Sequence, residues 1–257
     1  PMISTYIALK ISSKWYMLLI QITIIIIILT TFILYVVWMP KNSYSGPFQP
    51  LSDDEEITRR QLEKHLNILA KEIGERNVWQ YQGLISSANY IEEAFTDLGY
   101  EVKQQAYKVD GVTVTNLEAG LSGTTLPDEI IIVGAHYDSV SGCPGANDNA
   151  SGVAGLIEAA RLLSNNKLSR TVRFVAFVNE EPPFFQTSRM GSLVYATRSR
   201  QRGEKIIAML SLETIGYYSD EVGSQRYPFP FSFFYPNVAN FIGFVGNLSS
   251  RGLVRRA

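Results

Sequence analysis

This chain contains few cysteine and histidine residues, and its positive and negative charges nearly balance. Its 257 residues include a single cysteine, Cys143, so no internal disulfide can stabilise the fold. Basic and acidic residues number 23 and 24, and the resulting net charge of −1 gives no indication of a nucleic-acid partner. No internal repeat is visible. With 46% hydrophobic and 18% charged residues, the composition is typical of one globular domain with an additional apolar segment.

The apolar segment lies near the N-terminus, at residues 15–39, and contains no charged residue. A helix of this length spans roughly 37 Å, enough to cross a hydrocarbon core of about 30 Å. Trp15 and Trp38 lie near its two ends, where aromatic rings favour the headgroup region. A cleaved signal peptide would have a shorter apolar core, of about 7–15 residues. We therefore predict a transmembrane helix at 15–39, which makes the lipid bilayer a partner.

Charges beside this segment favour one orientation in the membrane. Lys10 and Lys14 precede it and only Lys41 follows closely, which favours an N-terminus inside the cell. We expect the rest of the chain to face the periplasm or the cell exterior. The predicted organisation is an N-terminal flank at 1–14, the transmembrane helix at 15–39, a linker at 40–52 and a globular domain at 53–257.

Helical and strand-like patterns alternate beyond the linker. Apolar residues at helical spacing predict helices at about 53–73, 84–98, 150–163 and 188–197. Strand-like segments fall at 101–109 and 112–118, and nearly continuous apolar runs at 129–135, 171–178 and 205–212 predict three inner strands, buried on both faces. We expect an α/β fold with a mixed, mostly parallel central sheet and helices on both faces. The aromatic, proline-broken tail at 227–244 has no assignment.

Each of the three predicted inner strands ends in residue types that bind metals. A Gly-rich loop at 145–152, between the first two strands, adds a further carboxylate. In chain order the candidates are His136, Asp138, Asp148, Glu180, Glu181 and Glu213. Ligands gather at the carboxyl ends of strands in such folds, so we expect these side chains to converge.

Convergence would crowd negative charge. Asp148, Glu181 and Glu213 would bring three carboxylates into one small pocket, and like charges at close range disfavour ionisation unless a cation compensates. A pair of divalent metals would supply that charge. Zinc accepts imidazole nitrogen and carboxylate oxygen, which is the ligand set available here.

Each candidate also has a structural interpretation. A single histidine at a strand end is more often structural than metal-binding, and a Glu-Glu pair after a strand is often solvated surface. Asp148 or Asn149 could simply cap the helix that follows. Their joint occurrence at three strand ends favours the metal site.

Four motifs together resemble metallopeptidase family twenty-eight, over about residues 55–257. They are Gly134-Ala135-His136-Tyr137-Asp138-Ser139, Gly145-Ala146-Asn147-Asp148-Asn149-Ala150-Ser151-Gly152, Asn179-Glu180-Glu181 and Ser211-Leu212-Glu213-Thr214-Ile215-Gly216. That family comprises di-zinc aminopeptidases, with glutamate carboxypeptidases and glutaminyl cyclases as relatives. The resemblance implies a zinc-exopeptidase fold of the phosphorylase/hydrolase-like type.

The resemblance also implies a role for each candidate. His136 and Glu213 would bind one zinc, Glu181 the other, Asp148 would bridge both, Glu180 would be the general base, and Asp138 would orient the His136 imidazole. The implied enzyme is an aminopeptidase that holds two zinc ions per complete domain. Its substrate would be a peptide with a free N-terminus, attacked by a metal-activated water.

One part of the family pattern is missing. The Glu181 zinc should also have a histidine downstream of Glu213, but the chain contains only His65 and His136. His65 lies far upstream in an amphipathic helix, where we expect a surface or packing role. We expect the sequence to be a C-terminally truncated fragment, with a degenerate family member as the alternative. As written it should bind at least one metal weakly and have little activity.

Two other functions stay open. One is a glutaminyl-cyclase-like acyltransferase with a single zinc, and the other is a non-catalytic ectodomain that has kept the fold. Retention of Asp148 and Glu180 favours the peptidase over the ectodomain. Cys143 reads as a loop residue, because no neighbour in the sequence would activate its thiol. Gly152, Ala154 and Gly155 should let their helix approach the sheet closely and hold Asp148 in position.

Overall fold

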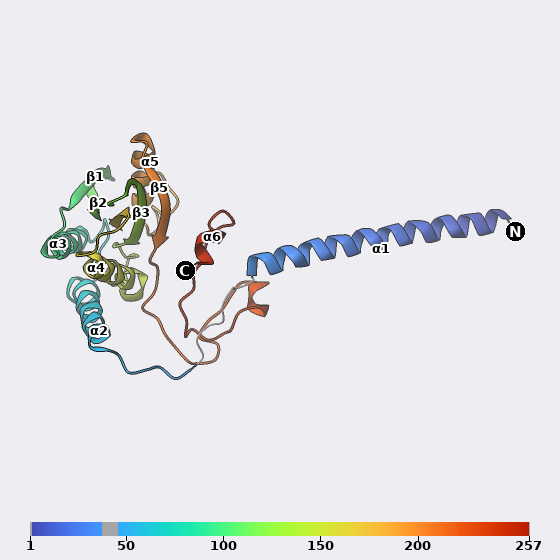
Figure 1. The fold of residues 1–257 in the computed structure, drawn as a ribbon, viewed down its shortest axis with the longest axis horizontal. Helices are drawn as coiled ribbons and strands as arrows, with labels where there is room; N and C mark the ends of the chain where they lie inside the picture. The colour runs from blue at the N-terminus through green and yellow to red at the C-terminus, as the bar shows by residue number, and fades with distance from the viewer. Residues whose placement is uncertain (1, 38–45, 257) are drawn as a thin grey trace. The chain divides into compact units, whose positions relative to one another are not determined.

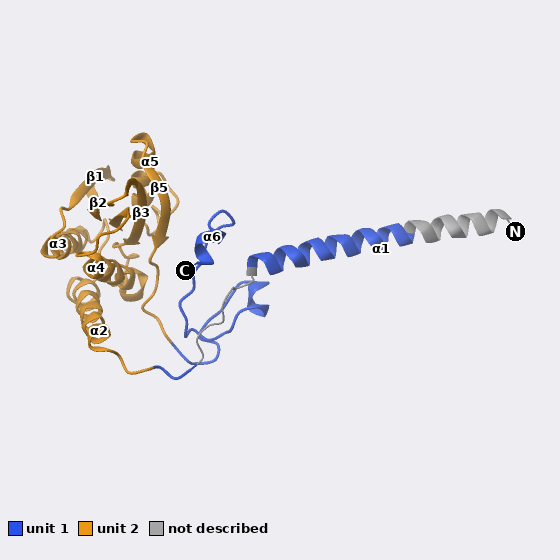
Figure 2. Cartoon of the chain, viewed as in Figure 1, with its two compact units in different colours: residues 1–48, 219–257 blue, residues 49–218 orange. Residues whose placement is uncertain are grey.

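The computed structural model of the protein describes residues 2–37 and 46–256. The chain divides into two compact units (Figure 2). One unit, Gln49–Tyr218, contains the β-sheet, and the other combines Pro1–Phe48 with Ser219–Ala257. All of the candidate metal ligands belong to the first of these.

The predicted apolar helix is present and is longer than expected. Helix α1 spans Met2–Val37, so it includes most of the predicted N-terminal flank. Its segment Trp15–Val36 has 22 residues and is long and apolar enough to cross a membrane. The predicted end of the transmembrane helix at Trp38 and Met39 lies outside the described residues, as does 40–45 of the predicted linker.

The first helix of the sheet-containing unit begins where the sequence predicts. Helix α2 spans Asp53–Leu66 and starts with a capping box, in which the Ser52 Oγ accepts from the Glu55 amide at 3.3 Å. The Glu55 Oε2 in turn accepts from the Ser52 amide at 2.8 Å. A π-helical stretch, η1 (Asn67–Ile73), continues α2, and α3 follows at Tyr81–Asp97.

The sheet has five strands in the order β1-β2-β4-β3-β5 (Figure 1). Their bounds are Lys103–Val109, Val112–Leu121, Leu126–His136, Arg170–Phe177 and Lys205–Ser211 for β1 to β5. The β1/β2 and β2/β4 pairs are antiparallel, whereas β3 runs parallel to both β4 and β5. The predicted mixed sheet is therefore confirmed, and its parallel half contains the three predicted inner strands.

One of those three strands lies at an edge of the sheet that the described residues form. Among the described residues, β5 pairs only with β3 and forms an edge of the sheet. Ile206, Ile207 and Met209 are accordingly exposed. In the described residues β5 is therefore not buried on both faces as predicted, because an apolar run indicates a strand without showing whether a neighbour covers it.

Helices cover both faces of the sheet, as predicted. On one face, Phe174 and Ala176 of β4 belong to the main core, which also includes residues of α3 and of α4 (Gly152–Leu163). On the other face, Val175 and Phe177 pack with Tyr195 of α5 (Gly191–Gln201). Alternate residues of one strand thus enter different cores, which is the period-two pattern of a strand buried on both sides.

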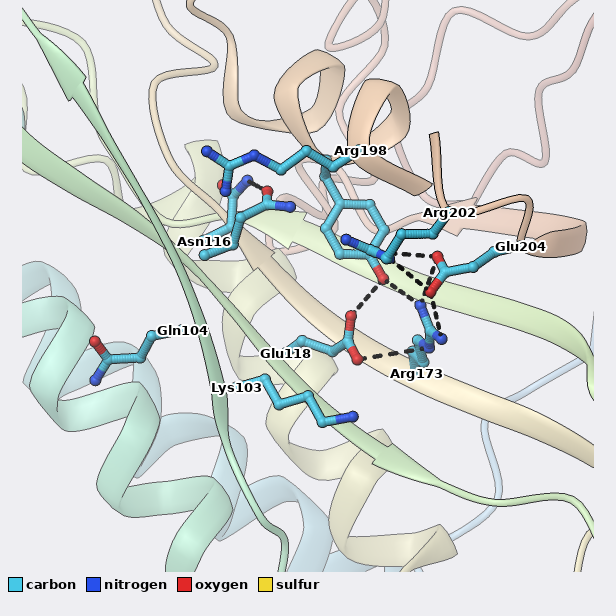
Figure 3. Close-up of a pocket in the computed structure, with 10 residues that line it drawn as sticks. Lys103, Gln104, Asn116, Glu118, Arg173, Arg198, Arg202 and Glu204 are labelled. Carbon is cyan, nitrogen blue, oxygen red and sulfur yellow. Dashed lines mark hydrogen bonds and ion pairs between the residues drawn. The ribbon is translucent and has the colours of Figure 1, made fainter. Parts of the chain in front are cut away.

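A polar cleft of about 430 Å³ lies on the α5 face (Figure 3). At its centre the Arg173 guanidinium donates to Glu204 at 3.0 Å and to the Tyr195 hydroxyl at 3.1 Å, and lies 3.5 Å from Glu118. The Tyr195 hydroxyl donates to Glu118 at 2.6 Å. These groups satisfy one another's hydrogen-bonding capacity and connect β2, β4 and α5. None of the candidate metal ligands lines the cleft.

His65 has the packing role expected of it. It is buried among α2, α3 and α4, where its Nδ1 lies 2.6 Å from the Tyr90 hydroxyl and its Nε2 lies 3.6 Å from Glu158. Arg161 forms an ion pair with Glu158 at 2.8 Å and offsets that carboxylate's charge. Burial lowers the pKa of His65 to about 4, and Lys64 and Arg161 act in the same direction.

We predict that His65→Gln makes the fold less sensitive to acid. An unfolded histidine has a pKa of about 6.5, so between about pH 6.5 and 4 the unfolded chain binds a proton that the fold excludes. The wild-type free energy of unfolding should therefore fall by about 1–3 kcal/mol as the pH drops through this window. Glutamine does not titrate, so the variant should lose less in denaturant titrations at pH 7 and 4.5. Equal losses in the two proteins would contradict the prediction.

Candidate metal centre

The candidate residues meet at the carboxyl edge of the parallel strands. His136 is the last residue of β3, Glu180 and Glu181 follow β4, and Glu213 follows β5. Because these three strands run in the same direction, their carboxyl ends lie side by side. Asp148 reaches the same place from η2 (Ala146–Ser151), the turn that precedes α4, in which Asp148 and Asn149 have non-helical backbone angles.

Three carboxylates surround the His136 imidazole. Its Nε2 lies 3.1 Å from Asp148 Oδ1, 3.5 Å from Glu213 Oε2 and 3.7 Å from Glu180 Oε2. His136 is buried, yet neither of its ring nitrogens has a partner with hydrogen-bond geometry among the described residues. A buried polar atom without a partner is costly.

A divalent cation fits this arrangement. One ligand atom each from His136, Asp148 and Glu213 lies within 4.8 Å of the other two. Imidazole nitrogen with carboxylate oxygen is a donor set that zinc accepts. The unpaired Nε2 is therefore suitably placed to donate its lone pair to an ion that the two carboxylates also contact.

The electrostatics of the site also favour a cation. Burial lowers the pKa of His136, but the carboxylates of Asp138, Asp148 and Glu213 outweigh burial and raise that pKa to about 12. The same contact lowers the pKa of Asp148. Both shifts have the direction expected where positive charge, on the imidazole or on a bound cation, is favoured among neighbouring carboxylates.

Glu181 and Glu180 occupy different surroundings. Glu181 is buried, and its Oε1 accepts from the Val140 amide at 3.2 Å. It does not belong to the compact group of His136, Asp148 and Glu213. Burial, together with Asp148 and other carboxylates, raises the pKa of Glu181 to about 7. The pKa of Glu180 is also raised, chiefly by burial. Both groups therefore hold protons more readily than an exposed glutamate does.

Asp138 makes contacts that the sequence does not predict. Its carboxylate accepts from the backbone amides of Glu180 and Glu181, both at 3.1 Å. Its Oδ1 lies 3.5 Å from His136 Nδ1, close enough for an ion pair but without hydrogen-bond geometry. Asp138 thus connects the ends of β3 and β4, and its strongest contacts are with the backbone of the Glu-Glu pair.

Asn149 is a site residue that sequence reasoning considered only as a helix cap. Its Oδ1 does accept from the Gly152 amide at 3.0 Å, at the start of α4. Its Nδ2, however, donates to the Leu212 carbonyl at 2.9 Å and to Glu213 Oε2 at 3.3 Å. Asn149 therefore orients Glu213, while Asp148 contacts His136 and does not cap. Cys143, expected to be a loop residue, is exposed.

Comparisons with known proteins relate the chain to one family of peptidases. The sequence profile of Peptidase family M28 matches residues 116–232, which include every candidate residue. The uncharacterized protein YfbL of Escherichia coli is 39% identical over 241 residues, covering 90% of this chain and 73% of YfbL. A probable zinc metalloprotease of Pyrenophora tritici-repentis is 32% identical over 121 residues, covering 44% of this chain and 27% of the fungal protein.

Solved structures share the fold at low sequence identity. A zinc aminopeptidase from Bacillus subtilis has a TM-score of 0.55 and 16% identity, with 72% of this chain and 75% of that chain covered. A glutaminyl cyclase from an Acidobacteriales bacterium has a TM-score of 0.53 and 19% identity, with coverage of 72% and 68%. The α/β sheet with helices is therefore an aminopeptidase-like fold.

We predict that Gly155→Leu weakens metal binding. A Cβ atom at Gly155 would lie 3.0 Å from Ile215 Cδ1 and 3.5 Å from Leu212 Cδ1, and these two residues flank Glu213. The larger leucine side chain should displace α4 or the Glu213 segment and lower metal affinity on the order of 10-fold, as measured by competition with a chromogenic chelator. Gly155→Ala is the matched control, because Ile215 can yield to one methyl group. Wild-type affinity in Gly155→Leu would contradict the prediction.

Proposed function

Because the chain belongs to peptidase family M28, we propose that it is a zinc-dependent exopeptidase of the aminopeptidase type, anchored in a membrane. The observation that carries this proposal is the buried His136 imidazole, whose Nε2 has carboxylate oxygens at 3.1, 3.5 and 3.7 Å but no hydrogen-bond partner among the described residues. The probable zinc metalloproteases among the relatives support zinc as the ion.

The ligands of the first zinc would be His136, Asp148 and Glu213, which form the compact three-residue group. A second zinc would share Asp148 and bind Glu181, as in the expected two-zinc site. The chain offers that ion no further imidazole, since its other histidine, His65, packs among the helices. This chain should accordingly hold the second ion weakly and turn over slowly.

Zinc bound at this centre would lower the pKa of a water molecule and polarise the scissile carbonyl group of the substrate. Glu180 would take the proton from that water. Its Oε2 lies 3.7 Å from the His136 Nε2, beside the proposed metal position, and burial raises its pKa, which makes it a better proton acceptor than an exposed glutamate. The same carboxyl group would then deliver the proton to the leaving amine.

The substrate would be a peptide with a free N-terminus. The side chains of Asp148, Glu180 and Glu213 all reach solvent, with 52%, 30% and 45% of their surfaces exposed. Their negative charge favours a substrate ammonium group over a blocked or acidic terminus. The name of the Bacillus subtilis structural neighbour, a zinc aminopeptidase, is consistent with this choice.

The membrane anchor would be α1. Its segment Trp15–Val36 is uncharged, has 22 residues and is exposed along its length. Such a surface is stable in a hydrocarbon environment and unfavourable in water. The excess of lysine before the segment favours a peptidase domain outside the cytoplasm, in the periplasm or at the cell exterior.

A glutaminyl cyclase with one zinc is the second candidate. It is favoured by the presence of one complete ligand group among the described residues, and fold neighbours include a glutaminyl cyclase. The two activities differ in their products. A peptidase releases an amino acid from an aminoacyl reporter, whereas a cyclase releases ammonia from a peptide that begins with glutamine.

We predict that the full chain, purified in detergent with zinc supplied, retains at least one zinc ion. His136→Gln should abolish this retention, because it removes the nitrogen ligand that the carboxylates surround. His65→Gln is the matched control, since it changes the other histidine and should leave the zinc content unchanged. Elemental analysis after dialysis measures the zinc per chain. A correctly folded wild-type protein without zinc would refute the proposed function.

Glu180→Gln should separate catalysis from metal binding. Glutamine cannot accept the water proton, so we expect a fall in kcat of about 10²–10⁴-fold on an aminoacyl reporter in excess zinc, with zinc content maintained. Glu181→Gln should instead reduce the uptake of a second zinc. Blocking the reporter's amino group should abolish hydrolysis by the wild type. If Glu180→Gln kept the wild-type rate, its role as the base would be wrong.

A further inference from the structure

Arg76 is the largest fully buried side chain of the described residues, and no aspartate or glutamate accepts a hydrogen bond from it. Its guanidinium donates only to backbone carbonyl groups. We propose that Arg76 is a positioning residue of the metal centre, which clamps both ends of the loop between the ligands His136 and Asp148. This inference rests on the proposed function, because it concerns ligands of the proposed zinc.

The contacts of the guanidinium join the two ends of that loop. Its Nε donates to the Tyr137 carbonyl at 2.6 Å, directly after His136. Its Nη2 donates to the Gly145 carbonyl at 2.8 Å, three residues before Asp148, and its Nη1 donates to the Pro144 carbonyl. One rigid planar group therefore sets the separation between the start and the end of the loop.

The same guanidinium connects the loop to the helical layer. Its Nη1 also donates to the carbonyl groups of Leu69, at 3.3 Å, and Gly74, at 3.0 Å. The Leu69 carbonyl belongs to η1, which continues α2. The guanidinium is therefore also attached to a part of the fold outside the metal centre, and a shift of the whole loop would break these bonds.

The backbone of Arg76 adds a second connection to the first part of the loop. Its amide donates to Ser139 Oγ at 3.1 Å, and its carbonyl accepts from the Ser139 amide at 2.9 Å. Ser139 Oγ donates in turn to the Cys143 carbonyl at 2.9 Å. Both parts of the loop, the residues after His136 and those before Asp148, are thus connected to a single residue.

Gly145 is shaped to receive the guanidinium. Its φ of +56° is a conformation that glycine adopts readily and other residues rarely do. A Cβ atom there would lie 3.1 Å from Arg76 Nη2 and 2.4 Å from the Asp148 carbonyl oxygen. A side chain at residue 145 would therefore crowd the loop's own Asp148 carbonyl first and the guanidinium as well.

Lysine would not serve the same purpose. An ammonium group has three donors around one nitrogen, whereas the contacts here need a planar fork with separate donors for Tyr137, Pro144 and Gly145. Arg76→Lys therefore keeps the positive charge near the site and removes the geometry. The variant tests the geometry of the clamp with the smallest available change of charge, because both side chains are cationic in water.

The test compares Arg76→Lys with Arg173→Lys in the full chain in detergent. Arg173 is the matched control, because it is a largely buried, fully bonded arginine in the polar cleft on the other face of the sheet (Figure 3). We expect Arg76→Lys to bind zinc 10–100-fold more weakly by chelator competition. With cobalt(II) as the probe, its visible absorption bands should lose intensity or shift. Arg173→Lys should match the wild type in both measurements.

Hydrogen exchange of the metal-free wild type gives a second test that does not depend on a folded variant. The Ser139 and Ala150 amides, which donate to the Arg76 and Gly145 carbonyls at 2.9 and 3.0 Å, should be protected before any metal is added. If they exchange freely and become protected only with zinc, the metal orders the loop and the proposal is wrong. A folded Arg76→Lys with wild-type affinity and cobalt spectrum would also overturn it. Absence of zinc from the wild type would instead refute the proposed function.

Discussion

Acidic side chains crowd around one buried imidazole at the carboxyl edge of the sheet, and the neighbouring structure is arranged to tolerate that crowding. Oxygens of three different carboxylates lie within 3.7 Å of His136 Nε2. The fold supplies backbone amides to Asp138 and Glu181 and the buried charge of Arg76 nearby. Burial lowers the pKa of Arg76 to about 10, and the charge of Asp138 opposes that fall, so the guanidinium stays charged at neutral pH.

Strand direction is what makes the crowding possible. Because β3, β4 and β5 are parallel, a short polar sequence after each of them reaches the same edge. The antiparallel β1 and β2 contribute no ligand and instead extend the sheet under α3 and α5. The loop after β3 completes the site, because it places Asp148, in η2, beside the end of that strand. Arg76 donates hydrogen bonds to this loop near both of its ends.

Local sequence patterns predict the elements and the ligands well, because both have short-range signals. The capping box at Ser52, the apolar runs of β3 and β4 and the polar residues at their ends are each visible within about ten residues. The missed features are long-range. Arg76 contacts carbonyl groups 61 to 69 residues away, and Asn149 reaches Glu213 across 64 residues. An arginine after a helix reads as solvated surface, and nothing near it in the sequence indicates burial.

Asp138 and Asn149 are not proposed metal ligands, but each holds a different part of the site in place. Asp138 binds the amides of Glu180 and Glu181, so it fixes the proposed base and one proposed ligand through their backbone. Asn149 donates to the same Glu213 oxygen that faces His136, and accepts from the first amide of α4. Neither residue needs a particular ion for these bonds. Hydrogen bonds of the chain itself therefore help to place Glu180, Glu181 and Glu213, the residues that a zinc hydrolase or cyclase would use.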